Sequence, residues 1–237
     1  MLQAIKRHFS PIHRIYQYHE LAAQRVDWPD GLAHFFATPL PDVKEFIGEL
    51  SLLAFDFETS GVDAQRDQIL SIGWVPLAQQ TIDIGASGEL FVRHTEYVNA
   101  RSAEIHQLTP HALANGIELD QAMDQLFAQL AGKVALVHGA SIEKAFIDHY
   151  MQTRFGFECL PCLWVDTLMI EKELTFSGKT HAHASFQLSD LRADYRLPNY
   201  TAHSAGIDAL STAELLIAQL KTIFKGHSPR LEKLICR

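Results

Sequence analysis

The chain has 237 residues, of which 47% are hydrophobic and 20% are charged, which is enough for one globular α/β domain with an extension. Its net charge of −8 argues against sequence-independent binding along an extended stretch of duplex DNA, but it does not exclude brief binding of a few nucleotides. The sequence has no apolar run of the ~20 residues that span a bilayer and no signal-peptide core, and its three cysteines do not make a disulfide framework. We therefore expect a cytoplasmic protein that has no membrane partner.

The chain begins with an amphipathic helical extension at residues 1–48, in which prolines interrupt the pattern. A main domain is expected at 49–225 and a tail at 226–237. The apolar runs predict short strands at 52–57, 69–75, 89–93, 134–137 and 163–165. Apolar residues at three- and four-residue spacing predict helices at 119–130, 142–154, 166–174, 187–195 and 208–224, and an exposed loop is expected at 175–185.

The order of these elements indicates the fold class. Three strands come early and close together, which favours an antiparallel meander, and the later strands alternate with helices as in βαβ units. We expect an α/β fold with one mixed sheet flanked by helices.

Two acidic residues stand where the first strand ends. Asp56 and Glu58 are two residues apart, so both leave the same face of the strand, while Phe57 points to the opposite, core face. Far downstream, His203 and Asp208 open an Ala/Leu-rich helix. Taken alone, the first pair is typical of an exposed strand end, and Asp208 of a first helical turn. Together they indicate metal-dependent phosphodiester hydrolysis, whose two-metal form needs carboxylates from separate elements.

Three segments carry a family resemblance. Residues 55–61 match Phe-Asp-x-Glu-Thr-Thr-Gly except at one position, residues 203–209 match His-x-Ala-x-x-Asp-Ala, and residues 138–143 align with His-Asn-Ala-x-Phe-Asp. Residues 105–109 also resemble Ile-His-Gly-Ile-Thr. The chain thus resembles the histidine-bearing branch (DEDDh) of the DEDD exonuclease superfamily over residues 52–216. Members of this superfamily include the proofreading epsilon subunit of bacterial DNA polymerase III and the oligoribonucleases.

The resemblance implies a ribonuclease-H-like fold and a site for two Mg²⁺ or Mn²⁺ ions. Asp56, Glu58 and Asp208 would hold the tightly bound ion, Asp56 would also bridge to the second ion, and Glu143 would support that second ion. His203 would be the general base that takes a proton from the attacking water. Without metal, neighbouring carboxylates repel one another by up to ~4 kcal/mol per pair, so the apo site should be loose or protonated.

The second motif departs from the family pattern at three positions. Gly139 replaces Asn, Ile142 replaces Phe, and Glu143 replaces the metal-site Asp. A glutamate is one methylene longer, so it reaches the same ion only if its backbone withdraws or its rotamer changes. Reduced activity or an altered metal preference is the expected consequence.

The resemblance also implies residues that meet the substrate. Thr59 and Ser60 would contact the terminal nucleotide, and His106 its sugar or base; strand-end packing is the alternative for all three. The expected function is 3′-to-5′ removal of nucleoside 5′-monophosphates from single-stranded or frayed DNA ends. The alternatives are cleavage of short RNA, and a catalytically weakened subunit that binds nucleic-acid ends. A polymerase partner or a homo-oligomer is possible in each case.

Two cysteines have the spacing of a redox motif. Cys159 and Cys162 are separated by two residues, but no thioredoxin-like strand–motif–helix pattern surrounds them. A zinc site would need further ligands, for which His149, His181 and His183 are candidates. Free cysteines beside a strand are the favoured interpretation.

Overall fold

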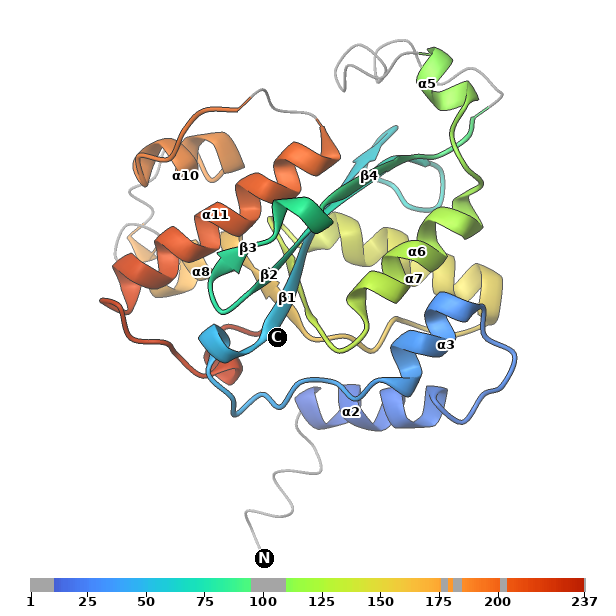
Figure 1. The fold of residues 1–237 in the computed structure, drawn as a ribbon, viewed down its shortest axis with the longest axis horizontal. Helices are drawn as coiled ribbons and strands as arrows, with labels where there is room; N and C mark the ends of the chain where they lie inside the picture. Colours follow the sequence, from blue (N-terminus) through green and yellow to red (C-terminus); the bar gives the residue numbers. More distant parts are fainter. Residues whose placement is uncertain (1–10, 95–109, 176–178, 181–184, 201–203, 237) are drawn as a thin grey trace, which may run out of the picture.

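A mixed sheet of six strands forms the centre of the computed structural model, which describes residues 11–94, 110–175, 179–180, 185–200 and 204–236 (Figure 1). The strands are β1 (Ser51–Thr59), β2 (Ile69–Ala78), β3 (Thr81–Ile82), β4 (Gly88–Phe91), β5 (Val134–Val137) and β6 (Trp164–Asp166). Their order is β3-β2-β1-β5-β6, and β4 also pairs with β2.

The strand directions confirm the predicted mixed sheet. β1 and β2 are antiparallel, and β2 also pairs antiparallel with β3 and β4, so the early strands form a meander. β5 lies parallel to β1, and β6 lies parallel to β5. The sequence did not predict β3, which has only two residues, and β2 continues to Ala78, beyond the expected end at residue 75.

Helices connect and cover the strands. The α-helices are α2 (Pro11–Ala22), α3 (Asp30–Ala37), α5 (Pro110–Ala114), α6 (Leu119–Leu130), α7 (Ser141–Phe155), α8 (Thr167–Leu174), α10 (Leu188–Asp194) and α11 (Ala205–Ile223). Short 3₁₀ helices are η1 (Ile47–Glu49), η2 (Ile84–Ala86) and η3 (Leu231–Lys233). None of the described helices has the length and apolar character needed to cross a membrane.

The helices form a layer on each face of the sheet (Figure 1). On one face, Leu53, Phe55 and Phe57 of β1 belong to a core cluster shared with α3, α6 and α7. On the other face, Leu52 and Ala54 of β1 pack with side chains of α8 and α11. Successive residues of β1 therefore face opposite layers, as the alternation of strand side chains requires.

The N-terminal extension and the C-terminal tail both contribute to this structure. Phe35 and Phe36 of α3 are buried in the same cluster as Phe55, and the Asp124 carboxylate accepts the backbone N–H of Gly31 at 2.8 Å, in the first turn of α3. In the tail, the N–H of Leu231 donates to the carbonyl of Glu45. The described parts of the extension and of the tail thus pack against the sheet-and-helix core.

Candidate metal centre

The alternation of β1 places its two acids. Leu52 and Ala54 face α11, so Asp56 and Glu58, which continue the same series, also face α11. Glu58 is buried with 4% of its surface exposed, and Asp56 is partly buried. Phe57 lies between them and is buried on the opposite face, as predicted.

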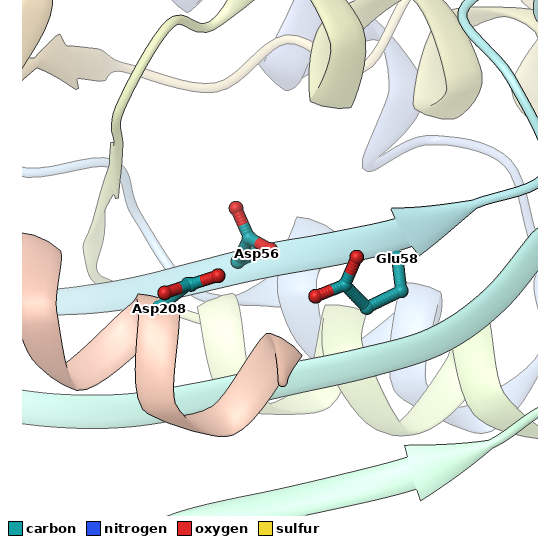
Figure 2. Close-up of side chains that lie close together, drawn as sticks. All are labelled: Asp56, Glu58 and Asp208. Atoms are coloured by element: carbon teal, nitrogen blue, oxygen red, sulfur yellow. The ribbon is translucent and has the colours of Figure 1, made fainter. Parts of the chain in front are cut away.

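The first turns of α11 bring a third acid to the pair. Asp208 lies in the first turn of α11, and one carboxylate oxygen from each of Asp56, Glu58 and Asp208 lies within 4.8 Å of the others (Figure 2). We call these three residues the acid triad. Among the described residues, no other group of three or more His, Cys, Asp or Glu side chains lies close enough to hold a metal ion. Three converging carboxylates suit a hard divalent cation such as Mg²⁺ or Mn²⁺.

A glycine in β2 makes this approach possible. Gly73 pairs with Asp56, and a Cβ on Gly73 would lie 2.1 Å from the backbone nitrogen of Gly206. The start of α11 therefore lies directly on the β2 backbone beside Asp56. The sequence motifs do not include Gly73, although a glycine inside a strand is a known signal for close backbone approach.

The surroundings of Asp56 disfavour its charged form. Burial raises the pKa of Asp56 well above its usual range, and the charges of Glu143, Glu58, Asp208 and Glu89 raise it further, in that order. A carboxyl group in this state is either protonated or neutralised by a cation. The raised pKa of Asp56 favours its protonated form when no metal is bound, and the expectation of a loose or protonated apo site stays a prediction.

Glu143 lies beside the acid triad but is not part of it. It lies in the first turn of α7, is 4% exposed, and has a pKa that burial raises to about 8. Its Oε2 atom is buried and has no hydrogen-bond partner among the described residues. A buried carboxylate oxygen without a partner is costly unless a proton or a cation satisfies it. The donor set therefore fits a metal centre larger than the triad alone.

The segment that carries Glu143 is held by Asp166 at the end of β6. The Asp166 carboxylate accepts backbone N–H groups from Gly139 at 2.8 Å, from Ala140 at 2.9 Å and from Leu168 at 2.8 Å. It thereby fixes the entry to α7 and caps α8. The sequence analysis missed this role, because it depends on the pairing of β5 with β6.

Gly139 itself has a φ of +86°. In this left-handed region glycine costs least and asparagine is one of the better-tolerated alternatives. A glycine at this position therefore suits the backbone that leads into α7.

The loop after β1 is closed by its own hydroxyl groups. Thr59 Oγ1 donates to the carbonyl of Gly61 at 2.6 Å, and Ser60 Oγ donates to the Asp67 carboxylate at 3.2 Å. Ser60 Oγ also accepts the N–H of Gln68 at 2.9 Å. Both hydroxyls thus shape the loop, and substrate contact by these residues stays a prediction. His106 and His203 lie outside the described residues, and their expected roles also stay predictions.

The cysteines form no metal or disulfide site in the described structure. Cys159, Cys162 and Cys236 are free thiols, and burial raises the pKa of each. The candidate zinc ligands His181 and His183 lie outside the described residues. The favoured interpretation of free cysteines agrees with the structure.

Comparison with known families decides the assignment. A family model described as Exonuclease (RNase T) matches residues 53–216, which contain all of α7 and most of β1 and α11. The chain belongs to the RNase T exonuclease family. This confirms the resemblance that the sequence motifs indicated, and with it the expectation of an enzyme of the exonuclease class.

Curated relatives of this exonuclease domain include proteins named as DNA polymerase III PolC-type and DNA polymerase III subunit epsilon. The chain is 23% identical to the DNA polymerase III PolC-type of Thermotoga maritima over 79% of its own length and 13% of that protein. It is 25% identical to the DNA polymerase III subunit epsilon of Treponema pallidum over 78% of its own length and 87% of that protein. The chain therefore spans about an eighth of PolC and most of epsilon.

Solved structures share the fold of the exonuclease domain. The nuclease domain of 3′hExo, described as a DEDDh family member bound to rAMP, superposes with a TM-score of 0.62 at 13% identity, covering 81% of this chain and 99% of that one. Exonuclease X in complex with 5′-overhanging duplex DNA superposes with a TM-score of 0.57 at 18% identity, covering 77% and 98%. The predicted ribonuclease-H-like fold is confirmed.

Proposed function

We propose that the protein is a metal-dependent 3′-to-5′ exonuclease that removes nucleoside 5′-monophosphates from single-stranded or frayed DNA ends. The observation that carries this proposal is the convergence of Asp56, Glu58 and Asp208 within 4.8 Å in a chain of the RNase T exonuclease family. The names of the curated relatives, PolC and epsilon, favour DNA over RNA and make a DNA polymerase the proposed partner.

The proposed chemistry assigns a task to each acid. Asp56, Glu58 and Asp208 would hold one divalent ion, with Asp56 shared by a second ion that Glu143 supports. Bound ions would lower the pKa of the attacking water and stabilise the negative charge on the leaving oxygen. His203, which directly precedes the N-cap residue Ser204 in the sequence, would accept the proton of that water.

The test is end shortening of a labelled strand. Single-stranded DNA and RNA of one sequence, both 5′-labelled, are incubated with Mg²⁺, with Mn²⁺ and with chelator. We expect a ladder of products that shorten from the 3′ end of DNA, only with metal. Asp56→Ala should abolish the ladder, and Asp42→Ala, which changes an exposed aspartate in the N-terminal segment, should leave it unchanged. Faster shortening of the RNA would contradict the proposed substrate, and no shortening of either strand would contradict the proposed activity.

A second candidate, an end-binding subunit with weakened catalysis, rests on Glu143. Glu143 stands where the family has an aspartate, and its side chain is one methylene longer. A misplacement of its carboxylate by ~1 Å can cost ~100-fold in rate. If this candidate holds, the wild-type chain binds 3′ ends without turnover and Glu143→Asp raises the rate strongly. A rate that Glu143→Asp leaves unchanged would remove this substitution as a cause of weak activity.

A further inference from the structure

Glu89 is an acid close to the triad that lies outside it. Glu89 is on β4 and pairs with Gly73, which in turn pairs with Asp56 on β1. Asp56, Gly73 and Glu89 therefore form a row across three strands on the face that α11 covers. Gly73, the central residue of this row, has no side chain. The backbone of another element can therefore approach the sheet closely at this position.

The start of α11 occupies that opening. A Cβ on Gly73 would lie 2.1 Å from the carbonyl carbon of Ala205, and a Cβ on Gly206 would lie 3.2 Å from Glu89 Oε2. Asp56 and Glu89 thus lie on the two sides of the place where the helix begins. A carboxylate is favourable there, because the N-terminus of a helix carries partial positive charge.

Ser204 connects Glu89 to the helix. Its hydroxyl donates to Glu89 Oε2 at 3.0 Å. Ser204 is the N-cap residue of α11, yet its side chain makes no capping bond to its own helix. A serine at this position ordinarily accepts an N–H of the first turn. Here the hydroxyl instead joins two segments that are 115 residues apart in the sequence.

The connection continues to the triad through one more hydrogen bond. The N–H of Asp208 donates to the carbonyl of Ser204 at 2.9 Å. Glu89, Ser204 and Asp208 are therefore linked in series. Glu89 itself is not among the acids whose oxygens converge within 4.8 Å. The charge of Glu89 raises the pKa of Asp56 directly, and the hydrogen bond to Ser204 is a second, geometric route from Glu89 to the site.

We infer that Glu89 is a positioning residue, which through Ser204 fixes the first turn of α11 and so the placement of Asp208 in the metal centre. This inference rests on the proposed function. It assigns the Glu89–Ser204 pair a role in turnover and in metal binding that acts through the position of Asp208.

The test compares Glu89→Ala, Ser204→Ala and the double variant with the wild-type chain. We expect each single variant to lower kcat by about tenfold with little change in KM, because a small displacement of a reacting group is costly. The double variant should lose no more than either single variant, since both remove the same bond. Glu89→Gln, whose amide oxygen still accepts from Ser204, should recover most of the lost rate.

Two further measurements do not depend on turnover. Mn²⁺ affinity, measured by calorimetry without substrate, should fall several-fold in Glu89→Ala and recover in Glu89→Gln. Hydrogen exchange of the backbone amides at 205–209 should become faster in Glu89→Ala. The matched controls are Ser87→Ala, which removes a hydroxyl bonded within its own turn, and Glu118→Ala, which removes an acid paired with Arg93. Neither should change turnover, Mn²⁺ affinity or exchange at 205–209.

Some outcomes would overturn the inference. Wild-type turnover in both single variants, or losses that multiply in the double variant, would show that the pair does not position Asp208. A wild type that shortens no oligonucleotide would remove the proposed function instead. In that case, Mn²⁺ affinity and amide exchange would still decide the role of Glu89, because unchanged values in Glu89→Ala would contradict it.

Discussion

At the scale of single residues, Glu143 has the least ordinary environment. It is buried beside the acid triad, burial raises its pKa to about 8, and its Oε2 has no partner among the described residues. The pKa of this carboxyl is therefore higher in the folded than in the unfolded chain. In the unfolded chain the Glu143 carboxyl loses its proton at a lower pH than in the folded chain. The stability that this carboxyl contributes is therefore present in acid and is lost as pH rises toward about 8.

We predict that the metal-free protein melts at a lower temperature as pH rises from about 5 to about 9. Glu143→Gln cannot ionise, so it should flatten this dependence and raise the melting temperature at the alkaline end. Thermal melts in chelator across this pH range measure the effect. The same melts with excess Mn²⁺ should show a weaker dependence for the wild type. A Glu143→Gln profile parallel to the wild-type profile would contradict the prediction.

Some residues of the site can be predicted from the sequence and others cannot. Asp56 and Glu58 follow from strand alternation, and Asp208 from its motif, because local patterns carry them. Asp166 and Glu89 act through pairings between strands and helices that are distant in the sequence, and no local pattern reports such pairings. Gly73 stands between these cases, since a glycine within a strand signals a close approach without naming the partner.

At the scale of elements, the contact between β2 and the start of α11 is the tightest at the site. The sequence predicts both elements, including the helix at 208–224, but places the helix start three residues later than the observed Ala205. Those three residues include Ala205 and Gly206, whose backbone lies on Gly73. Small residues at a helix start are compatible with a loop, so the sequence alone did not show that the helix begins on the sheet.

We predict that Gly73→Ala displaces the start of α11. The added methyl would lie 2.1 Å from backbone atoms of residues 205 and 206, which cannot yield as a flexible side chain would. Overpacking of this kind costs about 1–3 kcal/mol of stability. Because Asp208 would move with the helix, turnover should fall by ~100-fold. Denaturant unfolding and oligonucleotide shortening measure the two effects.

Gly85→Ala is the matched control for this substitution. A Cβ on Gly85 would meet only the Asp83 carboxylate, at 3.3 Å, at the surface-exposed η2. Stability and turnover should stay close to the wild-type values. A Gly73→Ala variant as active as Gly85→Ala would show that the helix start tolerates displacement.

At the scale of the whole molecule, the N-terminal helices are part of the main core. Phe35 is fully buried, and its ring packs against those of His19 and Phe36. Phe36 in turn packs against Trp28. The amphipathic pattern of residues 1–48 predicted helices there, but it could not show which surface they would cover.

We predict that Phe35→Ala destabilises the fold by about 3–5 kcal/mol, the usual cost of removing a buried aromatic ring. Val26→Ala, which changes a side chain that is 98% exposed, should stay within about 0.5 kcal/mol of the wild type. Urea unfolding of both variants measures the difference. Equal stability of the two variants would mean that α3 is not part of the cooperative core.

The packing of α3 also changes how self-association is best tested. Removal of residues 1–48 would take Phe35 and Phe36 out of the core and unfold the chain. Leu21→Asp alters an exposed position of α2, at 58% exposure, without touching the core. If the extension mediates a homo-oligomer, the mass in solution should fall in this variant, and an unchanged mass would argue against that role.

The C-terminal segment has a consequence beyond the site. β6 is three residues long and pairs with β5 on one side only; on its other side Ile235 bridges to Val165, and the N–H of Cys236 donates to the carbonyl of Trp164 at 3.0 Å. An uncovered edge strand is a template on which a second chain can add its own strand. We therefore predict that Ile235 and Cys236, by covering this edge, protect the protein from aggregation. A chain shortened before Ile235 would keep every acid of the metal centre and still be prone to precipitate.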